Sequence, residues 1–163
     1  MAERYFGPLP NRPLPPILHT REPQQLGPKM AIVESPTQPI AVVGYKRPDQ
    51  YDKDDAVFDV IERILSAGRT GLMYKELVQD KRIALNAQAS STFPSGRYPN
   101  LFVFILVPAL GHTVAENEKA FDEMLNRFLT QPVDPVALAR AKTQTRAAVI
   151  RRLANNSGLA QLL

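Results

Sequence analysis

Two short apolar runs in the first third of the chain favour β-strands. Met30-Ala31-Ile32-Val33 and Ile40-Ala41-Val42-Val43-Gly44-Tyr45 are rich in β-branched and aromatic residues, and the turn-like Ser35-Pro36-Thr37-Gln38-Pro39 separates them. We therefore predict strands near 29–34 and 39–47, each with at least one buried face.

From about residue 52 the apolar residues follow the spacing of a helix. Those residues are Val57, Val60, Ile61, Ile64 and Leu65. Asp54 and Asp55 precede them, where carboxylates favour a helix N-terminus, so we predict a helix over 53–67. Gly68, Thr70 and Gly71 form the predicted turn after it. Gly68 suits the position that follows a helix C-cap, and Thr70 suits the N-cap of a shorter helix over 70–79.

Two further strands are predicted at 82–91 and 100–108. Ile83, Leu85 and Ala87 alternate with polar or small residues, as in a half-exposed strand. The segment 101–107 is continuously apolar, which is typical of a strand buried in the centre of a sheet.

The last third of the chain predicts two helices, over 113–130 and 134–154. Thr113 can cap the first, and Asp134-Pro135 is a strong start signal for the second. Adjacent strands followed by adjacent helices indicate an α+β fold. We expect a two-layer sandwich with a mixed β-sheet and the helices on one face.

The length of 163 residues fits one domain of ordinary size. Ten of the 15 prolines fall in residues 1–50, and proline-rich sequence favours extended linkers. We therefore interpret residues 1–27 as a proline-rich linker between domains and 28–163 as the folded α+β domain. Because Leu159, Leu162 and Leu163 form an apolar ending with little to bury against, we expect truncation at the C-terminus and predict self-association.

The composition excludes several kinds of chemistry. There is no cysteine, which removes disulfides, thiolate metal sites and a cysteine nucleophile. The net charge of +4 permits weak attraction to anions without marking a nucleic-acid binder. The longest apolar run, residues 101–110, is about half a bilayer span, and no basic segment followed by an apolar one opens the chain. We expect no signal peptide, no membrane anchor and no nucleic-acid partner.

No motif marks an active site. The two histidines, His19 and His112, stand in no zinc-binding spacing, so no metal site is predicted. Gly68-Arg69-Thr70-Gly71 lacks the phosphate-loop patterns and follows a helix rather than a strand. The acid pairs Asp54/Asp55 and Glu116/Glu118 lie at predicted helix starts, and no serine lies in a nucleophile turn. We expect no catalytic residue in this chain.

Basic residues gather on the last predicted helix, at Arg140, Lys142, Arg146, Arg151 and Arg152. At about 100° per residue they spread over much of the circumference, and no aromatic residue follows Asp134. A solvated helix face is the favoured interpretation, and a phosphate-binding face is the alternative.

Four segments together resemble the pitrilysin/insulinase-type zinc metallopeptidases. They are Leu65-Ser66-Ala67-Gly68-Arg69-Thr70-Gly71-Leu72-Met73-Tyr74-Lys75-Glu76-Leu77-Val78 with Asp80-Lys81-Arg82-Ile83-Ala84, Pro39 to Pro48, Tyr5 to Pro10, and Leu153 to Ala160. They follow in register along nearly the whole chain. The chain is similar to the second, non-zinc domain of that family, taken as a fragment.

This resemblance implies a domain that forms part of a peptide-binding chamber opposite a homologous zinc-bearing domain. Zinc is then implied for that other domain and not for this chain, and a peptide is the implied substrate. Many such domains place an arginine and a tyrosine against the substrate backbone. Alignment on Leu77 and Ala84 puts Val78 and Leu85 at these positions. Substrate-binding residues therefore stay unassigned.

Three hypotheses for the function remain open on sequence alone. The first is the non-catalytic domain of an insulinase-like peptidase, and the second is an inactive structural subunit of a two-subunit peptidase. The third is a standalone interaction or anion-binding module. The resemblance is compatible with a bacterial periplasm or cytoplasm, and a homo-oligomer is a possible assembly.

Overall fold

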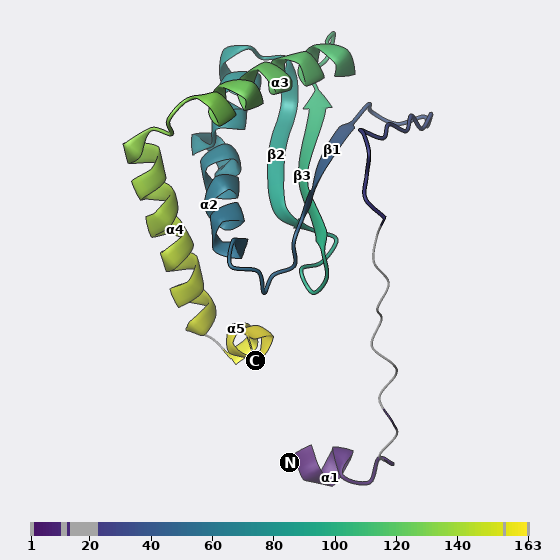
Figure 1. Ribbon diagram of the computed structural model, residues 1–163, viewed down its shortest axis with the longest axis vertical. Coiled ribbons are helices and arrows are strands. Elements are labelled where there is room, and N and C mark those ends of the chain that lie inside the picture. The colour runs from purple at the N-terminus through teal and green to yellow at the C-terminus, as the bar shows by residue number, and fades with distance from the viewer. Residues whose placement is uncertain (1, 11–12, 14–22, 155, 163) are drawn as a thin grey trace. The chain divides into compact units, whose positions relative to one another are not determined.

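The computed structural model describes residues 2–10, 13, 23–154 and 156–162 (Figure 1). The chain divides into two compact units, residues 1–35 and 36–163. The first unit contains the short helix α1 (Ala2–Phe6). The predicted linker includes residues outside the described ranges, so its extent stays a prediction.

The predicted strand at 29–34 is wrong. These residues form no strand, and Met30, Ile32 and Val33 are each about four-fifths exposed. An apolar alternating sequence becomes a strand only where another strand accepts its backbone hydrogen bonds, and the described residues offer none to this segment.

The second unit contains a three-stranded sheet in the order β1-β3-β2. The strands are β1 (Ala41–Arg47), β2 (Ala84–Phe93) and β3 (Asn100–Pro108). Both pairs are antiparallel, so the expected mixed sheet is corrected to an antiparallel one among the described residues. The continuously apolar segment forms the central strand, β3, as predicted.

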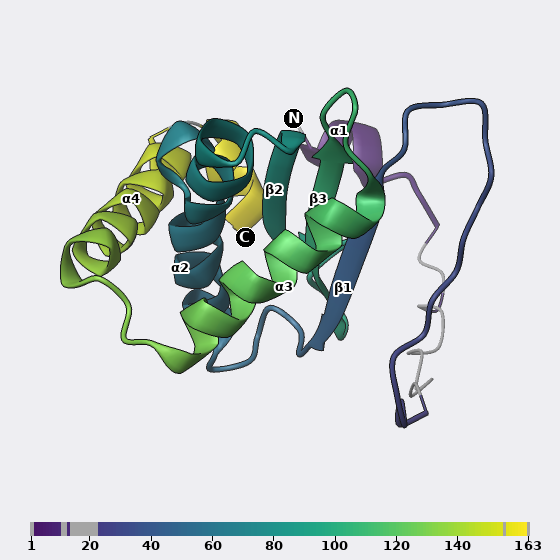
Figure 2. The same ribbon diagram turned by 90° about the horizontal axis from the view of Figure 1, so that it is seen from above.

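Helices α2 (Asp55–Ser66) and α3 (Val114–Thr130) cover one face of this sheet (Figure 2). One apolar core joins Phe102, Phe104 and Leu106 of β3 to Leu65 of α2 and Phe121 of α3. Val103 is also buried but points to the opposite face and takes no part in that core. The α+β class with helices on one face is confirmed.

Local signals start both long helices as predicted. Thr113 accepts a hydrogen bond from the Glu116 backbone, and the Glu116 carboxylate accepts from the Thr113 backbone, which completes a capping box on α3. Asp134 accepts from the backbone N–H groups of Val136 and Ala137 at the start of α4 (Pro135–Leu153). Helix α4 packs against α2.

The chain continues into α5 (Asn156–Leu162). Leu159 in this helix is 41% exposed. The side chain of Leu162 and the whole of Leu163 lie outside the described residues, so their packing stays a prediction. No helix among the described residues is long and apolar enough to span a membrane.

Candidate functional site

The turn after α2 orients the segment that carries the family-aligned positions. The 3₁₀ helix η1 (Gly68–Thr70) leads into η2 (Tyr74–Asp80), a π-helical segment. Gly68 has a φ of +54°, which a side chain disfavours. A Cβ at Gly71 would lie 2.7 Å from the Leu65 carbonyl oxygen, so only glycine fits without movement of the backbone.

Thr70 does not act as the predicted N-cap of the following helix. Its hydroxyl donates to the Ala67 carbonyl at 2.9 Å and thereby satisfies the C-terminus of the preceding helix. The residue N-terminal to η2 is Met73, whose side chain cannot cap. The Ala67 carbonyl thus accepts from both the backbone N–H and the hydroxyl of Thr70, an interaction that the sequence spacing did not reveal.

Val78 and Leu85 lie on either side of the connection between η2 and β2. The Ile83 amide donates to the Leu77 carbonyl at 3.1 Å across this connection. Val78 is half-buried and packs against the core, whereas Leu85 is 64% exposed beside a register irregularity of β2. Neither side chain carries a hydrogen-bonding group, so both positions present apolar side chains.

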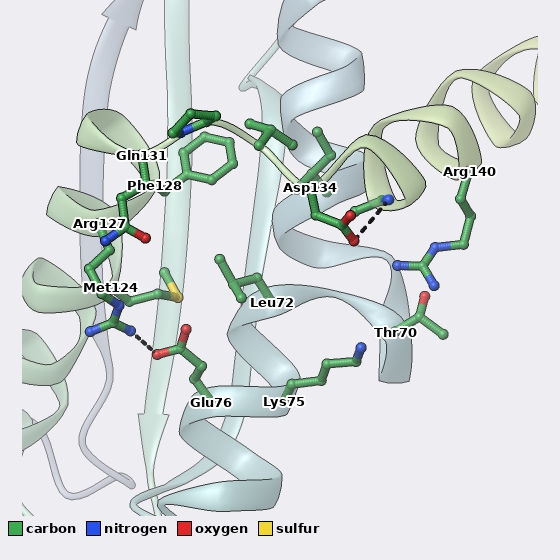
Figure 3. Close-up of a pocket in the computed structure, with 14 residues that line it drawn as sticks. Thr70, Leu72, Lys75, Glu76, Met124, Arg127, Phe128, Gln131, Asp134 and Arg140 are labelled. Atoms are coloured by element: carbon green, nitrogen blue, oxygen red, sulfur yellow. Dashed lines mark hydrogen bonds and ion pairs between the residues drawn. The ribbon is translucent and has the colours of Figure 1, made fainter.

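A cleft of about 270 Å³ opens between the end of α3, the start of α4 and the η1–η2 segment (Figure 3). Leu72, Met124 and Phe128 contribute apolar surface. Arg127 and Glu76 form an ion pair across one wall. None of the fourteen lining residues is a histidine or a serine, so the cleft offers neither a general base of that type nor a hydroxyl nucleophile beyond Thr70.

A second cleft, of about 300 Å³, lies between α2 and α4 and is lined by acidic side chains. Each of these carboxylates holds a neighbour in the fold. Asp55 pairs with Arg47, Asp59 accepts from the Ser91 hydroxyl at 2.9 Å, and Glu62 accepts from the Ser91 amide at 2.8 Å. These carboxylates have a structural role, because their bonds anchor α2 to the ends of β1 and β2.

The remaining titratable candidates are at helix ends. His112 Nδ1 lies 3.2 Å from Glu116 at the entrance to α3, and His19 lies outside the described residues. The backbone N–H of Thr113, followed by the His112 side chain, lowers the pKa of Glu116 from its ordinary value. Within the described ranges, no group of three or more His, Asp or Glu side chains is placed to hold a metal ion.

The basic residues predicted on the last helix all lie on α4 and are all exposed. They are Arg140, Lys142, Arg146, Arg151 and Arg152. Arg140 lines the first cleft and Arg152 the second, while the Arg151 Nε donates to the Ala147 carbonyl of its own helix. These residues therefore do not form one continuous basic face.

Comparison with known proteins places this arrangement in a family. Residues 1–145 match the family described as the Peptidase M16 inactive domain. The chain belongs to that family. The matched residues include the turn at Gly68–Gly71 and the connection between η2 and β2. The described inactivity of the family fits the absence of a zinc ligand set from the sequence motifs.

Two relatives extend this finding. The chain is 26% identical over 149 residues to the zinc protease PqqE of Helicobacter pylori, and the match covers 90% of this chain and 33% of the relative. The chain therefore spans about a third of that curated relative. The crystal structure of a protease from Helicobacter pylori shares the fold, with a TM-score of 0.68 and 24% identity over 76% of this chain and 29% of that one.

Sequence reasoning missed a buried arginine at the end of β1. Arg47 is 3% exposed and contacts the β2 end, α2 and the Phe58 ring. The sequence contained a signal for this burial. Every second residue of β1, namely Ala41, Val43, Tyr45 and Arg47, faces the helices. An arginine at the end of such a pattern is ordinarily read as the point where a strand reaches solvent.

Proposed function

We propose that this M16 inactive domain is the non-catalytic half of an insulinase-like zinc metallopeptidase. It packs against a homologous zinc-bearing domain and forms part of the wall of the peptide-binding chamber. The family match over residues 1–145 carries the proposal, and the similarity to a zinc protease of which the match covers 33% supports it. The zinc-bearing domain belongs either to the same parent chain or to a partner subunit.

Leu85 is the residue through which this domain is proposed to meet the peptide. It occupies the position that the family resemblance assigns to substrate contact, and its side chain points away from the core. Because Val78 is packed against the core, the aligned pair contributes one exposed apolar side chain and no hydrogen-bond donor. A peptide with an apolar side chain near this position fits that chemistry.

Reconstitution with the zinc-bearing domain of the parent tests the proposal. Peptide hydrolysis is measured for the zinc-bearing domain alone, for this chain alone and for the two mixed. We expect cleavage only from the mixture. Cleavage by the zinc-bearing domain at an unchanged rate without this chain overturns the proposed role.

A matched pair of variants tests the contact with substrate. Leu85→Asp places a charge at the family-aligned position, and Leu110→Asp places one at a fully exposed leucine between β3 and α3. We expect Leu85→Asp to raise KM for peptide about tenfold, as a lost apolar contact does, while Leu110→Asp leaves KM unchanged. Equal effects of both variants exclude Leu85 as a substrate contact.

A further inference from the structure

The cleft between the end of α3, the start of α4 and the η1–η2 segment combines an apolar floor with charged walls (Figure 3). Leu72, Met124 and Phe128 contribute apolar side chains to it. All fourteen lining residues lie in the range 64–140, inside the second compact unit. The shape of the cleft is therefore set within that unit.

The two carboxylates that line this cleft already have partners in the fold. Glu76 forms the ion pair with Arg127. The Asp134 carboxylate accepts from the backbone N–H groups of Val136 and Ala137, at 3.1 and 3.3 Å. Both acidic groups are thus engaged in holding the walls of the cleft in place.

Two cations of the cleft have no such partner. In the part of the chain that the structure describes, no hydrogen bond or ion pair engages the side chain of Lys75 or of Arg140. Figure 3 shows Lys75 extending from η2 and Arg140 from α4 toward the end of the cleft at Thr70. Because both charges are directed to one end, that end is complementary to an anion.

The segment that supplies Lys75 has an unusual backbone. η2 is π-helical, and the Lys81 amide donates to the Glu76 carbonyl at 3.0 Å, five residues back instead of the usual four. π-helical turns are rare and occur frequently at functional sites. This one carries Lys75 and Glu76 into the wall of the cleft, so the unusual backbone and an unpaired cation occur together.

We propose that this cleft binds the C-terminal carboxylate of a peptide whose last side chain is apolar. Lys75 and Arg140 donate to the carboxylate, and the last side chain lies against Leu72 and Phe128. The side-chain amide of Gln131, which also lines the cleft, bonds to the peptide backbone. A simple anion such as phosphate leaves the apolar floor unused, and a peptide without a free carboxylate leaves the two cations unpaired.

Titration of the whole natural chain, followed by nuclear magnetic resonance, tests the class of ligand. The probes are acetyl-Ala-Ala-Leu with a free carboxylate, the same peptide as its C-terminal amide, and inorganic phosphate. We expect the free acid to bind with a Kd of about 1 mM or tighter, about tenfold more tightly than either other probe, and to shift the methyl signals of Leu72 and Met124. Absence of saturable binding, equal binding of the amide or of phosphate, or shifts that spare both methyl signals overturns the proposal.

Three charge-removing variants test the two cations. Lys75→Gln and Arg140→Gln each remove one proposed donor, and Lys142→Gln is the matched control, because Lys142 is exposed on α4 and does not line the cleft. We expect each cleft variant to weaken binding of the free acid about tenfold and the control to change it less than about twofold. Unchanged amide spectra show that the variants are folded. Equal weakening in all three, or in none, overturns the proposal. It does not rest on the proposed function, since neither titration involves a zinc-bearing domain or hydrolysis.

Discussion

Arg47 and Asp55 form an ion pair that joins the end of β1 to the first turn of α2. The Arg47 side chain is fully buried, whereas that of Asp55 is 31% exposed. The guanidinium also donates to the Pro48 and Ser91 carbonyls and lies 4.6 Å from the centre of the Phe58 ring. One buried cation thus holds two strands and a helix together.

Loss of the carboxylate partner should destabilise the domain strongly. Asp55→Ala leaves the buried Arg47 charge without its counter-ion, and we expect a loss of about 3 kcal/mol in the free energy of unfolding. Asp54→Ala is the matched control, because Asp54 is adjacent, exposed and makes no side-chain capping bond. Urea denaturation measures both. If both variants lose a similar small amount of unfolding free energy, the Arg47–Asp55 pair contributes little to stability.

The two glycines of the turn after α2 should respond differently to alanine. In Gly68→Ala the added Cβ has no atom within 4 Å, so the only cost is the strain of a φ of +54°. We expect a loss of about 1 kcal/mol in the free energy of unfolding. Gly71→Ala forces the backbone at Leu65 and Ala67 to move, and we expect a loss of about 2 kcal/mol or more.

Thermal and urea unfolding of both variants measure this order. Gly27→Ala, which has open space and no positive φ, serves as the control and should change stability by less than about 0.5 kcal/mol. A larger loss in Gly68→Ala than in Gly71→Ala contradicts the role assigned to the close backbone approach.

Glu116 should make stability depend on acid pH. Its pKa in the folded domain lies below the ordinary value of 4.5, chiefly because the Thr113 backbone N–H donates to its carboxylate. A lowered folded pKa gives stability that is complete above the unfolded value and is lost as pH falls through the folded value. Stability from this group should therefore decline below about pH 4.5.

Glu116→Gln separates this titration from the rest of the protein. Glutamine keeps an oxygen that can accept from Thr113 but carries no charge. We expect the natural domain to be the more stable at pH 7 and the difference to shrink as the pH is lowered to 3, measured by denaturant unfolding across that range. Parallel pH profiles for the two proteins rule out the capping carboxylate as the titrating group.

The isolated chain should hold no zinc and cleave no peptide. It has two histidines in no metal-binding spacing and no cysteine, so a tight tetrahedral site lacks its usual ligands. Elemental analysis of the purified chain and a peptide-hydrolysis assay check both points. About one tightly bound zinc per chain contradicts this prediction, whatever its activity.

Local chemistry was sufficient to predict the starts of α3 and α4 and the central strand. The capping box at Thr113 and the Asp134-Pro135 pair act within four residues of themselves, so their effect can be read from neighbours in the sequence. The seven apolar residues at 101–107 have no polar face to present to water on either side of a sheet. The positions of Val78 and Leu85 were assigned through the family resemblance, and their contact with a peptide stays a prediction.

Only the tertiary structure decided which strands pair and which polar groups are buried. The segment 29–34 has the composition of a strand but lies exposed, while β1 with a similar composition pairs with β3 some sixty residues later. Arg47 is buried because Asp55 and Phe58 of α2 and the Ser91 carbonyl of β2 meet around it. Strand pairing and charge burial depend on partners distant in sequence, whose positions no local pattern encodes.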